Sequence, residues 1–101
     1  MKIVFEWDSK RAASNARKHG VYFETATLVF RDANFLAAIQ FDAEGEQRWQ
    51  TIGLVNGVLM LVVIHTTFDS DQVEHIRIIS ARRATPQERA RYERENGSNY
   101  R

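Results

Sequence analysis

The chain has 101 residues, of which 44% are hydrophobic and 27% are charged, and its formal net charge is +1. This length suits one domain with one modest core, and the absence of cysteine excludes disulfides, thiolate metal ligands and thiol nucleophiles. The longest apolar run, residues 58–64, is too short to cross a bilayer, and residues 1–8 lack the pattern of a signal peptide. We therefore expect a cytoplasmic protein without a membrane segment.

The first third of the chain predicts a short strand and two helices. Residues 3–7 are expected to form the strand, and Asp8 is suited to cap a helix over 9–19 that Gly20 ends. Residues 23–30 carry apolar side chains at a spacing that places them on one side of a second helix. A turn follows.

The remainder of the chain predicts four strands and a last helix. The strands are expected over residues 35–41, 48–55, 59–67 and 73–82, and an acidic loop, an Asn-Gly hairpin turn and a polar turn join them. Thr85-Pro86-Gln87-Glu88 is a capping box with proline at the first helical position, and it predicts a helix to about Glu95.

This order of elements predicts an α+β fold. The short connections favour an antiparallel sheet, and we expect the helices to cover one side of it. The apolar strand over 59–67 has two apolar faces, so it is expected at the centre of the sheet and covered on both sides. Residues 1–95 are expected to form the single domain, and residues 96–101 a frayed tail.

Charge is distributed unevenly along the chain. Residues 1–31 carry six basic and three acidic residues, a charge of +3; residues 32–75 carry one basic and seven acidic residues, a charge of −6; and residues 76–101 carry seven basic and three acidic residues, a charge of +4. Two readings stay open, namely that the basic ends meet and bind a polyanion or acidic partner, or that the charges are simply solvated.

Three histidines are candidates for chemistry. His19 ends the first helix, where capping the helix carbonyls is the favoured reading. His65 interrupts an apolar strand, so it is either a hydrogen-bonded core residue or part of a site. His75 lies near a strand start and is read as a surface residue. No two histidines have the spacing of metal ligands, and we expect no metal and no cofactor.

With cysteine absent and no metal site expected, the polar side chains that the chain does contain are of types that suit RNA cleavage. RNA carries its own nucleophile, the 2′-hydroxyl, so a protein need only position that oxygen, remove its proton and stabilise the phosphate charge. Regular alternation places Arg77 and Arg82 on opposite faces of the last strand unless a bulge intervenes. Glu88 and Tyr92 share one face of the last helix. For the arginines of that helix, solvated surface is the favoured reading.

Four segments together resemble a known family. They read WDSKRAASNARKHGVYFETATLVF (7–30), EQRWQTIG (46–53), VVIHT (62–66) and RIISARRATPQERARY (77–92), and in combination they are similar to the BrnT family of type II toxins. The resemblance implies a small ribonuclease with a RelE-like fold. It also implies a BrnA-type antitoxin as partner, whose DNA-binding portion represses the operon, so operator DNA is contacted only through the antitoxin.

The resemblance also suggests site residues. Catalytic candidates are His65, Thr66, Arg77, Arg82 and Tyr92, with an arginine on the phosphate and His65 as acid or base. RNA-binding candidates are Lys10, Lys18, His19, Arg48 and Arg83. The basic N-terminal helix is expected to form one wall of an RNA cleft, and the last strand and helix the other. The antitoxin is expected to cover this basic cleft with an acidic or apolar segment.

One position departs from the family pattern. Members commonly carry arginine two positions after the threonine of the His-Thr pair, and Phe68 stands there in this chain. Losing one cation aimed at the phosphate costs on the order of 10²–10³ in rate. The alternative function is therefore a catalytically weakened binding module that acts with the antitoxin in autoregulation of the operon. Phe68 as a stacking platform is a less favoured reading.

Overall fold

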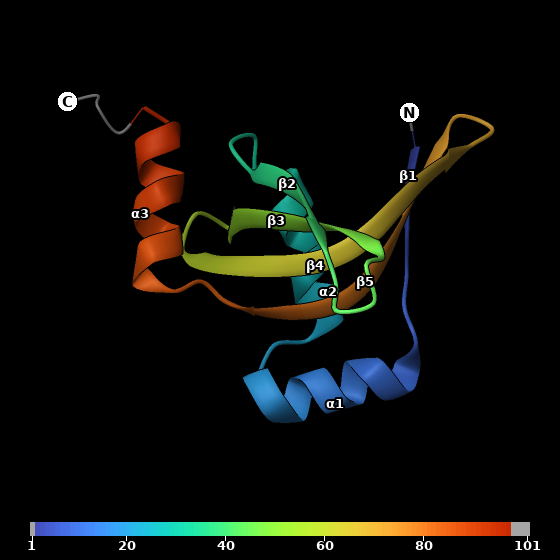
Figure 1. Cartoon of the computed structure of the whole chain (residues 1–101). Helices are drawn as coiled ribbons and strands as arrows, with labels where there is room; N and C mark the ends of the chain where they lie inside the picture. Colours follow the sequence, from blue (N-terminus) through green and yellow to red (C-terminus); the bar gives the residue numbers. More distant parts are fainter. Residues whose placement is uncertain (1, 98–101) are drawn as a thin grey trace.

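The computed structural model describes residues 2–97, which form one five-stranded sheet with helices packed against it (Figure 1). The order of the elements confirms the predicted α+β fold, and no helix among the described residues is long and apolar enough to cross a membrane. In chain order the elements are β1 (Lys2–Glu6), α1 (Ser9–His19), α2 (Phe23–Ala26), the 3₁₀ helix η1 (Thr27–Arg31), β2 (Leu36–Phe41), β3 (Gln47–Val55), β4 (Leu59–Ser70), β5 (Val73–Arg83) and α3 (Pro86–Glu95).

The helix caps and the hairpin turn that the local sequence predicts are present in the structure. The Asp8 side chain accepts a hydrogen bond from the Lys10 amide at 2.9 Å and caps α1. Thr85 and Glu88 make both bonds of the capping box that opens α3. Asn56-Gly57 turns the chain between β3 and β4 with positive φ at both residues, the backbone that a tight hairpin turn needs.

The chain end differs in part from expectation. The predicted frayed tail lies outside the described residues from 98 to 101. Asn96 belongs to the described part, and its side chain donates to the carbonyls of Tyr92 and Asn34 at 2.9 and 3.0 Å. The end of α3 is therefore tied to the loop before β2.

The sheet has the strand order β1-β5-β4-β3-β2, with β4 at its centre as predicted. The strands from β2 to β5 form an antiparallel meander, but β1 pairs parallel to β5, so the prediction of an antiparallel sheet is wrong for β1. The whole of α1, α2 and the meander connects these two strands. A connection of that length leaves either strand direction open.

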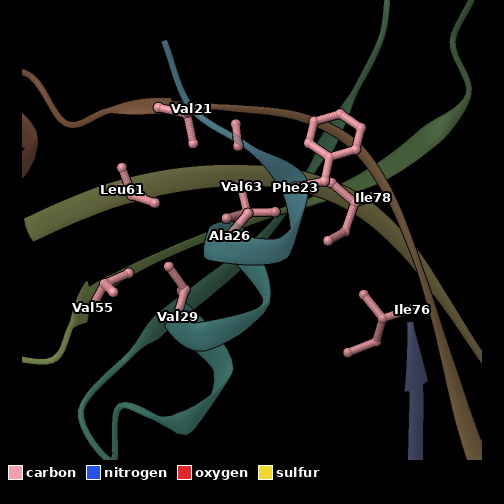
Figure 2. Close-up of a cluster of buried hydrophobic side chains, with 10 residues drawn as sticks. Val21, Phe23, Ala26, Val29, Val55, Leu61, Val63, Ile76 and Ile78 are labelled. Carbon is pink, nitrogen blue, oxygen red and sulfur yellow. The ribbon is translucent and has the colours of Figure 1, made fainter. Parts of the chain in front are cut away.

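One face of the sheet, here called the helix face, is covered by α1, α2 and η1. Phe23, Ala26 and Val29 of the two short helices pack there on Leu61 and Val63 of β4 (Figure 2). Gly53 of β3 allows η1 to approach the sheet, since a Cβ at this position would lie 2.9 Å from Val29 Cγ1. These contacts form the larger of the two core clusters.

The opposite face, here called the open face, is covered by α3 at one end. Tyr92 of α3 packs against Ile52, Met60 and Val62, which alternate in sequence with residues of the helix face. The prediction that all helices lie on one side is therefore wrong. The apolar residues on both faces of β4 need cover on both sides, and α3 supplies it for the open face.

Helix α1 also closes an open edge of β5. Strand β1 pairs with β5 only as far as Arg77, so within residues 2–97 the following backbone of β5 has no strand neighbour on the side opposite β4. Asn15, which is buried, accepts a hydrogen bond from the Ala81 amide and donates to the Ala81 and Val21 carbonyls. Its carboxamide satisfies backbone groups that would otherwise be buried without partners.

Candidate functional site

A β-bulge in β5 determines which side chains share the open face. Ile64 of β4 pairs with Ser80, whereas the next residue, His65, pairs with Ile78, so β5 has one extra residue. The bulge shifts the alternation of side chains. Arg77 pairs with Thr66 and Arg82 pairs with Val62, and positions 62 and 66 lie on one face. Both arginines therefore lie on the open face, which a regular strand would forbid.

Arg77 is part of a cluster that joins the first and last strands. Glu6 of β1 lies opposite Arg77, and its carboxylate contacts Arg77 Nη1 at 3.4 Å and His75 Nδ1 at 3.8 Å. Thr66 is the cross-strand neighbour of Arg77. A carboxylate, an imidazole, a guanidinium and a hydroxyl thus meet on an accessible surface.

Phe68 extends this cluster toward the β4–β5 turn. It pairs with His75, and the two rings stack with centroids 4.6 Å apart and planes 6° apart. Phe68 is 56% exposed, so part of the phenyl ring is open to solvent. At this position an exposed aromatic ring therefore lies stacked on an imidazole.

Arg82 is held by α3. Its guanidinium donates to both carboxylate oxygens of Glu88, at 2.8 and 2.9 Å, and Glu88 also accepts from the Thr85 amide. The hydrogen bonds from Arg82 are the main cause that lowers the pKa of Glu88 to about 2. Two bonds in a fork fix the guanidinium plane as well as its position. The capping residue of α3 therefore also orients a cation of the open face.

His65 lies on the other side of the sheet. It is 4% exposed, and burial lowers its pKa. Its Nδ1 faces the Thr66 carbonyl at 3.3 Å, and its Nε2 lies 2.7 Å from Thr51 Oγ1. A carbonyl only accepts, so Nδ1 carries the proton, and Nε2 accepts from the Thr51 hydroxyl. Both nitrogens of a neutral ring are occupied, which is the arrangement of a hydrogen-bonded core histidine.

Tyr92 is also committed to a structural contact. Its hydroxyl donates to Asp32 Oδ2 at 2.6 Å, and the same oxygen accepts from the Leu54 amide at 2.8 Å. Burial and the bond to Asp32 raise the pKa of Tyr92 to about 12. Burial raises the pKa of Asp32, but hydrogen bonds from Leu54, Tyr92 and Asn34 outweigh it, and the net shift is downward. This contact joins α3 to the end of η1.

The basic residues of α1 line a groove beside the bulge. Lys18 and His19 face Ile79 and Ser80 of β5 across a hollow of about 220 Å³, which Arg11 also lines. Lys10 is exposed two turns before Lys18 on the same helix. The groove is adjacent to the β5 segment that carries the open-face arginines.

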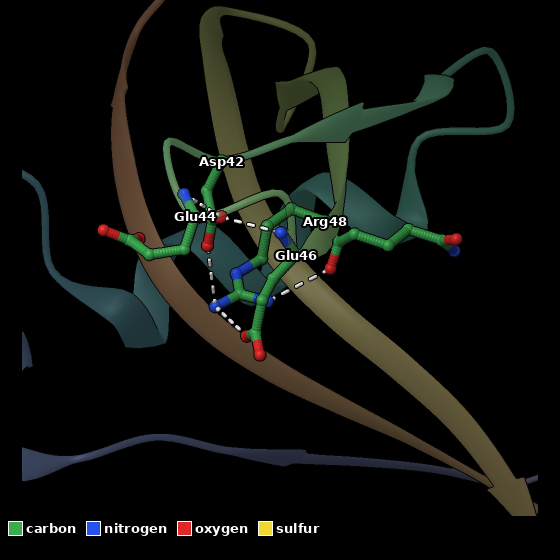
Figure 3. A network of polar contacts seen from close by, with 5 residues as sticks. Asp42, Glu44, Glu46 and Arg48 are labelled. Atoms are coloured by element: carbon green, nitrogen blue, oxygen red, sulfur yellow. Dashed lines mark hydrogen bonds and ion pairs between the residues drawn. The ribbon is translucent and has the colours of Figure 1, made fainter.

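The remaining two RNA-binding candidates lie apart from this groove. Arg48 contacts Asp42 and Glu46 at 3.2 and 3.1 Å in the β2–β3 loop (Figure 3). These two carboxylates balance its charge. Arg83 is exposed at the end of β5.

Two residues of the open-face cluster were not among the sequence-based candidates. The sequence context of His75 indicates a surface residue, and nothing in the sequence context of Glu6 marks it as a candidate. Only the parallel pairing of β1 with β5 places Glu6 between His75 and Arg77, and no short-range signal in the sequence marks that pairing. Among residues 2–97, no three His, Cys, Asp or Glu side chains are grouped so that they could hold a metal ion.

Comparison with known proteins shows a matching family model and a similar solved structure. A family model described as "Ribonuclease toxin, BrnT, of type II toxin-antitoxin system" matches residues 7–88. The 1.1 Å crystal structure of the Brucella abortus ribonuclease toxin BrnT has a similar fold, with a TM-score of 0.57 and 24% identity over 84% of this chain and 99% of that chain. No curated protein sequence matches this chain.

Proposed function

Because the chain belongs to the BrnT family of ribonuclease toxins from type II toxin–antitoxin systems, we propose that it cleaves RNA at the Glu6–His75–Arg77 cluster without a metal ion. The observation that carries the proposal is the joining of three complementary groups on one accessible face. The family supplies the reaction class, and the cluster supplies groups able to perform it.

In the proposed reaction the RNA provides the nucleophile. His75 or Glu6 accepts the proton of a 2′-hydroxyl, whose oxygen attacks the adjacent phosphorus as the bond to the 5′-oxygen breaks. The other group, which carries a proton at the start, donates it to that leaving oxygen, which gives a 2′,3′-cyclic phosphate and a 5′-hydroxyl. Arg77 stabilises the extra negative charge on the phosphate, and Thr66 beside it donates a hydrogen bond.

Arg82 and the α1 groove are proposed to hold the RNA on either side of the reacting phosphate. Four strand residues separate Arg77 from Arg82, a span of about 13–16 Å, so they contact different phosphates. Lys18, His19 and Lys10 extend the basic path along α1. Several phosphate contacts make RNA affinity fall steeply as salt is raised.

His65 and Tyr92 are proposed to act through the fold. Both nitrogens of His65 are engaged inside the sheet, and the Tyr92 phenol is bound to Asp32 with its pKa raised to about 12. Neither side chain offers a free proton site toward the open face. Arg48 is likewise left out of the RNA path, because two carboxylates balance its charge.

A catalytically weakened toxin is the second candidate, and Phe68 is the observation that favours it. The ring of Phe68 stacks on His75, at the position where we expect the family pattern to have an arginine that faces the phosphate. Under this second candidate, Phe68→Arg raises the cleavage rate on the order of 10²-fold by restoring one electrostatic donor. Under the leading proposal it changes the rate less than about threefold. Cleavage of a short RNA by the two proteins decides between them.

The family implies a protein antitoxin, which we propose to be of the BrnA type. The proposed complex binds operator DNA through the antitoxin alone, and we propose that the toxin acts in the cytoplasm, where its RNA substrates are. Residues 1–95 are proposed as the functional domain.

The leading proposal is tested by cleavage of a short RNA in the presence of a chelator. We expect Arg77→Ala to lower the rate on the order of 10²–10³-fold and Arg91→Ala, which removes an arginine that pairs with Glu95 on α3, to leave it nearly unchanged. An all-deoxy copy of the substrate should resist cleavage. Equal loss by both variants, or a requirement for a divalent metal, would overturn the proposal.

A further inference from the structure

One end of the helix face carries an apolar patch that no helix of the described residues 2–97 covers. Helices α2 and η1 pack over the middle of that face and stop at Arg31. Beyond them lie Ile3, Phe35, Ile39 and Phe41, which are 43%, 41%, 49% and 67% exposed. We call these four residues, together with Trp49, the apolar patch. Such a concentration of large exposed apolar side chains is typical of an interaction surface.

A cavity of about 180 Å³ opens in the patch between Ile3, Phe35 and Trp49. Its polar lining is already paired: Thr51 bonds His65 at 2.7 Å, and Thr67 donates to Glu74 at 2.9 Å. The cavity therefore offers apolar and aromatic walls and few free polar groups. It suits one apolar side chain of a partner better than a polar ligand.

The patch borders an open edge of the sheet. Strand β2 is the last strand, and within the described residues only β3 pairs with it. Its sequence, LAAIQF, has no charged residue and no proline, which are the usual protections of an exposed edge. Ala37, Ile39 and Phe41 are every second residue of β2, so all three side chains lie on the side of the patch. An extended segment can add to this edge through backbone hydrogen bonds and place alternate side chains on the patch.

Acidic loops flank the patch. The β2–β3 loop, residues 42–46, and the β4–β5 turn lie at the same end of the meander, and Glu74 lines the cavity. Residues 32–75 carry seven acidic residues and one basic residue, Arg48, so their net charge of −6 already includes the ion pairs of Arg48 with Asp42 and Glu46. The negative potential of these acidic loops repels RNA and attracts a segment with basic residues. A second copy of the chain would bring another acidic end to the patch.

We propose that the apolar patch and the β2 edge bind an extended, apolar segment of the antitoxin that is flanked by lysine or arginine. The identity of the partner rests on the proposed function. The docking surface differs from the basic cleft that the sequence suggested, because the apolar patch arises only when β2, β3 and β1 assemble. RNA and the antitoxin then contact different regions of the toxin.

The test is calorimetric titration of the toxin with the full-length antitoxin encoded beside its gene. Ile39→Lys and Phe41→Lys should each raise Kd on the order of 30-fold, the effect of losing a central apolar anchor. Val58→Lys is the matched control, because Val58 is 78% exposed at the β3–β4 turn, at the other end of the meander. It should leave Kd unchanged. Because Ile39 and Phe41 are exposed already, both variants should fold, with unchanged circular dichroism.

A second measurement follows Trp49 directly. In a Trp7→Phe background, Trp49 is the remaining tryptophan, and its emission should shift to the blue as the antitoxin covers it. The affinity should also weaken with salt, because basic flanks meet the acidic loops. A Trp49 emission that the antitoxin leaves unchanged would contradict the proposal.

Three further outcomes would overturn the proposal. The first is an unchanged Kd for both patch variants. The second is loss of binding by Lys18→Glu together with Arg82→Glu while Ile39→Lys binds normally, which would place the antitoxin on the basic surface. The third is a dimer of the toxin alone that Ile39→Lys dissociates, which would make a second copy the occupant. RNA cleavage by Ile39→Lys is measured in a separate experiment without antitoxin. The binding experiment therefore tests the docking proposal even if the toxin does not cleave RNA.

Discussion

The histidines on the two faces of the sheet differ in burial and in the partners of their ring nitrogens. On the helix face, His65 is buried, and both of its nitrogens are bound by Thr51 and the Thr66 carbonyl. On the open face, His75 is half-buried, with Nδ1 toward Glu6 and its ring against Phe68. The comparison teaches that the histidine with the more conspicuous sequence context supports the sheet, whereas the inconspicuous one has the surroundings that acid–base chemistry needs.

The largest expected effect comes from removing the open-face histidine. His75→Ala should lower the RNA cleavage rate by roughly 10²–10⁴-fold, because it removes a proton-transfer group, and it should change thermal stability little. The measurement is single-turnover cleavage beside the melting temperature. Arg91→Ala, at a residue that pairs with Glu95 outside the proposed RNA path, serves as the control. A normal rate in His75→Ala would remove the acid–base assignment from the open face.

The buried histidine should affect folding. His65→Ala should lower the free energy of unfolding by about 2–4 kcal/mol, since it leaves a cavity and an unpaired Thr51 hydroxyl. Burial lowers the pKa of His65 below 6.5, so its protonation favours the unfolded chain. The native protein should lose stability as pH falls below 6.5, and the variant should lose less over that range. Urea titrations at several pH values measure both effects, and a folded variant with low activity would instead support catalysis by His65.

A smaller effect is expected where α3 holds Arg82. The folded-state pKa of Glu88 is about 2, below its ordinary 4.5, so its contribution is present above pH 4.5 and is lost as pH falls toward 2. Solvent screening limits that contribution to about 1–2 kcal/mol. Glu88→Gln should remove this part of the acid dependence of stability. If the variant unfolds with the same acid profile as the native chain, the ion pair contributes nothing measurable.

The smallest expected effect concerns the contact of α3 with η1. Tyr92→Phe should lower the free energy of unfolding by about 1 kcal/mol, because Asp32 keeps its bond from the Leu54 amide. A raised pKa of about 12 for Tyr92 means that its contribution is complete below pH 10 and is lost as pH rises through 12. Denaturant titrations at pH 7 and pH 11 compare the two proteins. If Tyr92→Phe instead lost most of the RNA cleavage rate at unchanged stability, the result would support a catalytic role for Tyr92.

The sequence by itself determined the local structure and the family. Capping residues, the Asn-Gly turn and apolar periodicity depend on neighbours within a few positions, so α1, α3 and the meander follow from them. The apolar residues on both faces of β4 likewise indicate a central strand that is covered on both sides, whereas only the tertiary structure places α3 on the open face.

Tertiary structure alone decided the site. The parallel pairing of β1 with β5 joins residues about 70 positions apart, as in the contact of Glu6 with Arg77, and the bulge at Ile79 places Arg77 and Arg82 on one face. Neither feature has a local signal, because each depends on how strands distant in the chain align. For the same reason the sequence could list the charged residues but not show that Arg48 is balanced by Asp42 and Glu46, or that Tyr92 is bound to Asp32.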